Sequence, residues 1–247
     1  MTLPMPLDTP ATQLLDNIVW HSLIGPQAQF ASGIGNTRRF AKGFSPLLAF
    51  ADPDRPDFSA IAPFCDAGEQ FYSDGWSGLA PAGWQIEFES TMFKMVWHGA
   101  AHVRDEAPDA VALGTSHAAQ AVELARLTKP GPFDLRTLEL GEYFGYFEGG
   151  RLIAMAGERL QAGSLREISG VCTHPDARGR GLARRLMTKL LHRQLRRGQL
   201  PFLHVVRENQ TARAIYQRMG FREYRESAVR IVARRDHGQA SSIHAGA

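Results

Sequence analysis

A glycine-rich turn between a strand and a helix is the feature that most constrains how this chain can fold. The segment Val171–Ala183 reads VCTHPDARGRGLA, so a strand-like run ends at Thr173 and an apolar-striped segment begins at Leu182. The first N–H groups of a helix have no partner within it, and the helix dipole adds partial positive charge there. Glycines let the backbone approach a phosphate closely, and Arg178 and Arg180 add formal charge. The turn therefore predicts an anion site at a helix start.

Taken alone, this turn has two interpretations. It can cradle a phosphate, or it can be a strand-to-helix turn in which the glycines only permit tight packing. It is not a Walker A loop, because no Lys-Ser or Lys-Thr pair follows the glycines. It is not a dinucleotide-binding fingerprint either, because the G-x-G-x-x-G spacing is absent and hairpins precede it.

Hydrophobic periodicity predicts that strands and helices alternate in the second half of the chain. Helices are expected over His117–Leu127, from the turn to about Arg197, and over Asn209–Met219. Strands are expected over Ala110–Leu113, Tyr143–Phe147, Arg151–Gln161, Leu165–Thr173 and Phe202–Val206. The segment Phe221–Ala233 is expected to form one bent strand or two strands. In the first half we expect a helix over Thr12–Leu23 and one or two strands over Trp84–Trp97. The glycine turn at Gly149–Gly150 indicates that the strands beside it pair as a hairpin.

A polar, proline-bearing stretch at Arg104–Pro108 predicts a boundary between two parts of the chain. We expect an N-terminal domain over 1–103, a second domain over 109–235, and a disordered Gly/Ser/Ala-rich tail over 236–247. The N-terminal part carries all 4 tryptophans of the chain, which should be buried against something. One hypothesis packs this part on the second domain as one wall of a ligand pocket, and the alternative is an independent domain on a tether.

Positive charge is concentrated in the second half of the chain. Between Arg151 and Arg235 there are 19 Lys and Arg against 6 Asp and Glu, whereas the remainder has 9 against 19. This segregation favours a polyanionic ligand, either a nucleic acid or a phosphate-rich cofactor. The alternative is a solvated, Arg-rich helix face.

Composition and hydropathy exclude several classes of protein. Cys65 and Cys172 are the only cysteines, so neither a disulfide-stapled secreted domain nor a zinc module is expected. No run approaches the roughly 18 apolar residues of a membrane span, and the first residues lack the pattern of a signal peptide. We therefore expect a reducing compartment, the cytoplasm, and no membrane partner.

A second motif about thirty residues after the turn makes the pattern specific. Asn209–Phe221 follows N-x-x-A-x-x-x-Y-x-x-x-G-F, and Val171–Ala183 follows V-x-x-x-P-x-x-R-G-x-G-x-A. Together these segments resemble the acyl-CoA-binding half of the GNAT acyltransferase superfamily. The chain is most similar to the FR47-like branch, which also resembles glycine N-acyltransferases. The resemblance covers about Asp109–Arg235; the segment 1–103 lacks the turn motif, and the hypothesis for it is a degenerate second GNAT-like half.

The resemblance implies a fold and a set of cofactor contacts. The fold is α+β in three layers, with a mixed, mostly antiparallel sheet that is flanked by helices and splayed at the cofactor site. The resemblance implies acetyl-CoA (coenzyme A) as the cofactor. The residues that would contact it are Val171, Cys172 and Thr173 beside pantetheine, Arg178, Gly179, Arg180, Gly181, Leu182 and Ala183 around the pyrophosphate, and Asn209, Ala212 and Tyr216 on the following helix. Asn209, Ala212 and Tyr216 share one helix face by their spacing.

The resemblance also implies direct attack of an amine on a thioester. Tyr216 would act as general acid on the departing thiolate, although a core aromatic fits its position as well. Glu167 is the candidate general base, Glu158 is the second, and a chain of waters is the alternative. Asn209 also suits a helix N-cap. Cys172 is expected to be a buried small residue, with an acyl-cysteine mechanism as the alternative.

The resulting hypothesis is an acetyl-CoA-dependent N-acetyltransferase that moves an acetyl or acyl group to a primary amine of a small molecule, amino acid or peptide. No metal site is expected. The oligomeric state, monomer or homodimer, stays open. One alternative is a non-catalytic acyl-CoA-binding sensor or scaffold. A nucleic-acid-binding protein is another, but exposed aromatics on a basic face and a known reading module are both missing from the sequence.

Overall fold

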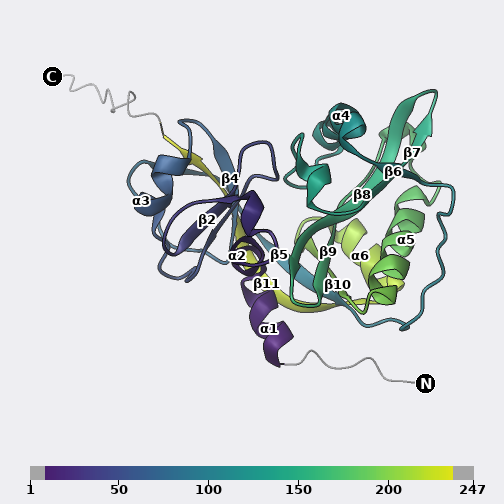
Figure 1. The fold of residues 1–247 in the computed structure, drawn as a ribbon, viewed down its shortest axis with the longest axis horizontal. Coiled ribbons are helices and arrows are strands. Elements are labelled where there is room, and N and C mark those ends of the chain that lie inside the picture. The colour runs from purple at the N-terminus through teal and green to yellow at the C-terminus, as the bar shows by residue number, and fades with distance from the viewer. Residues whose placement is uncertain (1–8, 236–247) are drawn as a thin grey trace.

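An eleven-stranded mixed sheet runs through residues 9–235, the part of the chain that this computed structural model describes (Figure 1). Its strands are β1 (Ala31–Ser32), β2 (Thr37–Phe40), β3 (Leu47–Phe50), β4 (Gln70–Asp74), β5 (Trp84–Trp97), β6 (Val111–Leu113), β7 (Tyr143–Glu148), β8 (Arg151–Ala162), β9 (Leu165–Thr173), β10 (Leu200–Val206) and β11 (Phe221–Arg234). In space their order is β1-β2-β3-β4-β11-β5-β10-β9-β8-β7-β6. Sequence order and spatial order therefore differ most at β5 and β11.

Helices cover both faces of this sheet. They are α1 (Thr9–Asp16), α2 (Ile18–Ile24), α3 (Phe58–Ile61), α4 (Ala118–Thr128), α5 (Leu182–Arg196) and α6 (Gln210–Met219), with 3₁₀ turns η1 (Ala28–Phe30), η2 (Ala62–Phe64), η3 (Thr115–His117), η4 (Thr137–Leu140) and η5 (Pro175–Ala177). The apolar stripe of α5 packs with Tyr216 of α6 and with Leu203 and Val205 of β10 in one core. Phe202 of β10 instead joins the core under α2. Since neighbouring residues of a strand point to opposite faces, α5 and α6 lie on one face and α2 on the other.

Strand β5 joins the two parts of the chain. It pairs antiparallel with β10 through Phe202–Val206 and with β11 along nearly its whole length. Strand β11 in turn pairs with β4, so β11 lies between two N-terminal strands. Strands from both sides of Arg104–Pro108 therefore form one continuous sheet (Figure 1).

Strands β9 and β10 separate soon after they meet. Their parallel pairing covers only Leu165–Glu167 of β9 against Leu200–Phe202 of β10. Beyond this point Gly170 has a φ of 63° and lies where the register of β9 against β8 shifts. A side chain rarely adopts such a φ, so glycine permits the bulge here. The predicted α+β fold, with a mixed sheet that is splayed and flanked by helices, is confirmed.

The helix expected over Thr12–Leu23 is wrong in one respect. The structure breaks it at Asn17, which has a φ of −129° and a ψ of 54°. The Asn17 amide donates a hydrogen bond to the carbonyl of Phe50 at 2.8 Å, and a side chain that bonds backbone elsewhere competes with helix continuation. The other expected helices and strands of the described residues are present, with ends shifted by one or two residues.

The tryptophans of the N-terminal part are divided between two cores. Trp76 and Trp84 pack with Phe58 in a core confined to the N-terminal elements and the end of β11. Trp97, at the end of β5, packs edge-on against Phe221 in the core beneath α5, with ring centroids 5.3 Å apart. Through Trp97, the N-terminal part thus contributes to the core of the second half.

We expect the fragment 109–247 to be insoluble or to melt without cooperativity when it is expressed alone. Removal of β5 leaves β10 and β11 without the strand between them and exposes the apolar core under α5. Co-expression with the fragment 1–108 should restore solubility. Circular dichroism melting and gel filtration would measure both effects, and a soluble, cooperatively melting fragment 109–247 would contradict the expectation.

Candidate cofactor and active site

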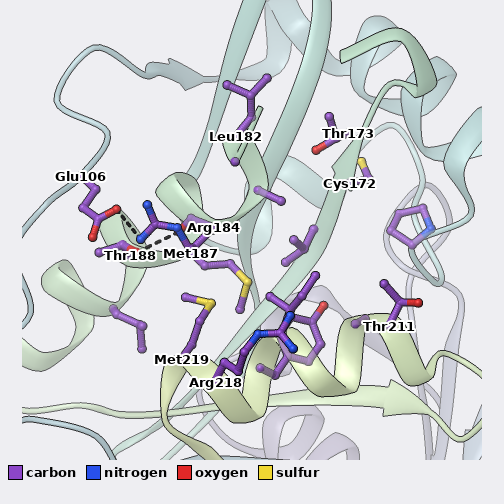
Figure 2. Close-up of a pocket in the computed structure, with 18 of the residues that line it drawn as sticks. Glu106, Cys172, Thr173, Leu182, Arg184, Met187, Thr188, Thr211, Arg218 and Met219 are labelled. Carbon is purple, nitrogen blue, oxygen red and sulfur yellow. Dashed lines mark hydrogen bonds and ion pairs between the residues drawn. The ribbon is translucent and has the colours of Figure 1, made fainter. Parts of the chain in front are cut away.

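A cleft of about 1030 Å³ lies between α5, α6 and the carboxyl end of β9. Figure 2 shows Cys172 and Thr173 of β9 on one side of it, Arg184 and Met187 of α5 on another, and Met219 of α6 below. All the residues predicted to contact the cofactor except Arg180 line this cleft: Val171, Cys172, Thr173, Arg178, Gly179, Gly181, Leu182, Ala183, Asn209, Ala212 and Tyr216. The structure therefore brings the two sequence motifs together around one space.

The turn before α5 has the backbone that an anion site requires. Gly179 and Gly181 have φ values of 77° and 73°, and Gly181 occupies the N-cap position of α5. No side chain caps this helix start, so its first N–H groups remain available. A Cβ atom added at either glycine would meet nothing within 4 Å, so φ is what demands glycine here. The open space beside these N–H groups suits a phosphate.

Basic residues near this turn differ in their partners. Arg180 does not line the cleft and pairs with Glu148 at 2.6 Å. Arg184 does line it and pairs there with Glu106 at 2.6 Å (Figure 2). Arg178 and Arg218 also line the cleft, and neither forms an ion pair with any residue between 9 and 235. These two guanidinium groups are therefore available to an anionic ligand.

Tyr216 lies on the α6 face that looks into the cleft. Its ring packs edge-on against Phe221 with centroids 6.3 Å apart. Burial raises the pKa of Tyr216 to about 12, so the phenol is protonated at neutral pH. Two turns earlier, Asn209 caps α6 by accepting a hydrogen bond from the Ala212 N–H at 3.1 Å. Asn209 is therefore an N-cap and also lines the cleft.

Cys172 is a buried thiol beside this phenol. Burial raises the pKa of Cys172 to about 11. The thiolate is the nucleophilic form of cysteine, and it is scarce at neutral pH for a group with this pKa. These surroundings disfavour the acyl-cysteine alternative and fit a small buried side chain.

Neither candidate base lines the cleft. The Glu167 carboxylate accepts hydrogen bonds from Arg159 at 2.7 and 3.0 Å, from the Leu160 N–H at 3.2 Å, and lies 2.7 Å from Nδ1 of His204. Burial by itself would raise the pKa of Glu167, but Arg159 and His204 outweigh it and hold this pKa at about 2. Glu158 bonds to Gln194 at 3.0 Å and pairs with Arg197. The role of Glu167 as the base stays a prediction. Its hydrogen bonds disfavour direct contact between this carboxylate and the amine.

The segment between β5 and β6, where the sequence predicted a boundary, forms a wall of the cleft. Val103 and Glu106 line the cleft, and Asp105 and the carbonyl of Ala107 bind Lys189 of α5 at 2.8 and 3.0 Å. The polarity of this segment resembles that of a linker, but its carboxylates face the basic side of α5. The sequence signal that could have revealed this contact with α5 is the group of acidic residues in the segment, which complements the basic residues of the helix.

Comparison with known proteins identifies the family. The family model described as FR47-like protein matches residues 143–231. A solved structure from Novosphingobium aromaticivorans, assigned to the GNAT family of acetyltransferases, is 32% identical, covers 90% of this chain and 99% of that one, and has a TM-score of 0.80. This chain belongs to the GNAT family.

Two more distant structures share the fold. A GCN5-related N-acetyltransferase-like protein from Streptococcus suis is 17% identical over 91% of this chain and 94% of that one, with a TM-score of 0.57. A GCN5-related N-acetyltransferase from Kribbella flavida is 16% identical over 89% and 96%, with a TM-score of 0.56. A search among curated proteins returned no match.

Neither a membrane-spanning helix nor a metal-binding cluster occurs in the described part of the chain. No helix between residues 9 and 235 is long and apolar enough to span a membrane. Across the same residues, no group of three or more His, Cys, Asp or Glu side chains is arranged to hold a metal ion.

We expect Gly181→Asp to weaken acetyl-CoA binding by at least roughly tenfold, whereas Gly181→Asn should weaken it much less. Both side chains tolerate a positive φ and can cap α5, so the two variants differ mainly in charge at the proposed phosphate position. Acetyl-CoA-induced shifts in melting temperature would measure the difference, because a ligand that binds the folded state stabilises it. Equal shifts for both variants and the unmodified protein would place the cofactor elsewhere.

Proposed function

We propose that this chain is an acetyl-CoA-dependent N-acetyltransferase that transfers an acetyl or acyl group to a primary amine of a small molecule, amino acid or peptide. One observation carries the proposal. The uncapped start of α5, the edge of β9 that β10 leaves unpaired and the side chain of Tyr216 all border one cleft. A phosphate site, an extended backbone edge and a proton donor are the parts that acyl transfer from CoA requires.

The residues that would hold CoA are distributed along this cleft. The N–H groups of Gly181–Ala183, together with Arg178, would hold the pyrophosphate. The backbone of Val171–Thr173, which β10 leaves unpaired, would bind the amide groups of pantetheine as a neighbouring strand does. When bound, acetyl-CoA supplies an activated thioester, and a backbone N–H of β9 can polarise a carbonyl placed at this edge.

Tyr216 is suited to the departure of the thiolate. A phenol is protonated at neutral pH even at its ordinary pKa, and burial raises the pKa of Tyr216 further, to about 12. The same surroundings disfavour an unprotonated thiolate, so a proton donor beside the departing sulfur lowers the cost of its departure. Packing against Phe221 holds the ring in place.

We expect Tyr216→Phe to lower kcat by roughly tenfold to a thousandfold and to leave the affinity for acetyl-CoA nearly unchanged. The measurement is the release of free thiol from acetyl-CoA in the presence of a panel of amines. Tyr146→Phe is the matched control, since Tyr146 is also a half-buried tyrosine with a raised pKa but does not line the cleft. Unchanged turnover in Tyr216→Phe would reduce Tyr216 to a packing residue.

The same assay separates the enzyme from a binding protein. The unmodified chain should release thiol with at least one amine of the panel and much less without any amine. A chain that acetyl-CoA stabilises against heat but that releases no thiol with any amine would instead be an acyl-CoA-binding sensor or scaffold.

A further inference from the structure

A row of buried charged side chains crosses the middle of the sheet. It consists of Asp74 on β4, Lys94 on β5, His204 on β10, Glu167 on β9 and Arg159 on β8, each with a side chain no more than 9% exposed. Lys94 pairs with Asp74 at 2.8 Å, and Arg159 pairs with Glu167 at 2.7 Å. Each pair joins one basic and one acidic side chain, so the charges within each pair cancel. His204 lies between the two pairs.

The position of His204 in the sheet is defined by the strand register. Phe202 pairs with Glu167 in the last registered pair of β9 and β10, so His204 is the next residue of β10 on the same face. The rings of Phe202 and His204 contact each other with centroids 5.7 Å apart, which agrees with this placement. His204 therefore borders the opening between the two strands, on the face opposite α5 and α6.

The hydrogen bonds of His204 assign its neutral tautomer. Its Nδ1 lies 2.7 Å from Oε1 of Glu167, which Arg159 and His204 keep ionised. A carboxylate only accepts hydrogen bonds, so Nδ1 carries the proton and donates it, and Nε2 keeps its lone pair. Nε2 is buried and has no hydrogen-bond partner among residues 9–235. A buried acceptor without a partner costs free energy, and such an atom in a native protein calls for an explanation.

We propose that Nε2 of His204 takes the proton from the acceptor ammonium at the opening between β9 and β10, and that Glu167 positions the imidazole and stabilises its cation. This inference rests on the proposed acetyltransferase function. The ammonium gives one proton to Nε2 and becomes an amine, whose lone pair forms the C–N bond as the C–S bond breaks. Tyr216 gives its proton to the thiolate, the second proton released from nitrogen restores the Tyr216 phenol, and His204 returns the first proton to solvent.

The groups that face His204 are compatible with this step. Glu167 contacts it directly, while Asp74 on β4 adds a second negative charge in its surroundings. Arg159 and Lys94 are each already bound to one of these carboxylates. A proton on His204 therefore has carboxylates near it from two strands, and in this proposal Glu167 positions the base instead of acting as the base itself.

The test compares the unmodified chain with His204→Gln on two amines, one strongly basic and one with a pKa below 7. We expect the variant to lose roughly a hundredfold in kcat/KM for the strongly basic amine and only a few-fold for the weakly basic one, which is already neutral. With the strongly basic amine, the kcat/KM of the unmodified chain should stay level until low pH, whereas that of the variant should fall from higher pH, because only the neutral amine then reacts. The affinity for acetyl-CoA should stay within twofold.

Three comparisons make the outcome decisive. His117→Gln, which changes a histidine outside the cleft at the start of α4, should keep full activity. Melting temperatures establish that each variant is folded, and His204→Asn serves as a second variant if His204→Gln is not. Equal losses on both amines, or an unchanged pH profile, would overturn the role of His204. An unmodified chain that releases no thiol with any amine would overturn the proposed function itself.

Discussion

The short parallel contact between β9 and β10 is the constraint on which the rest of this structure depends. Two strands that separate after three registered pairs leave backbone N–H and C=O groups without partners, which is costly inside a protein. The separation is tolerated because each strand keeps its other neighbour. Strand β10 remains paired with β5 through Val206, and β9 remains paired with β8 through Thr173. One edge of β9 is thereby left unpaired beside the cleft.

This dependence explains why the first half of the chain enters the centre of the sheet. Strand β5 supplies the partner that holds β10 away from β9, and β11 then holds β5 from its other side. Beyond the end of β5, Val103 and Glu106 continue along α5 and border the cleft. The N-terminal half thus supports the site through the sheet and also contributes one of its walls.

The features that could be predicted from the sequence are the local ones. A positive φ at Gly179 and Gly181 and a free helix start follow from residue types within one turn. Helix spacing likewise places Asn209 and Tyr216 on the same side of α6, facing the cleft. The place of β5 depends instead on pairing across more than a hundred residues, for which no local pattern exists. The sequence likewise shows that Glu167 carries a carboxylate, but it does not show that an arginine and a histidine surround this carboxylate in the fold.

The distribution of charge follows from the same geometry. Much of the positive charge of α5 is neutralised by acidic residues from before Arg151: Arg185 binds Asp109 at 2.8 Å, Lys189 binds Asp105, and Arg193 binds Glu142. The basic excess of the second half is therefore partly the complement of an acidic excess in the first, and a nucleic acid is not needed to explain it. Arg178 and Arg218 border the cleft without such partners in the described part of the chain. Arg178 precedes the uncapped start of α5, where the helix dipole also favours negative charge.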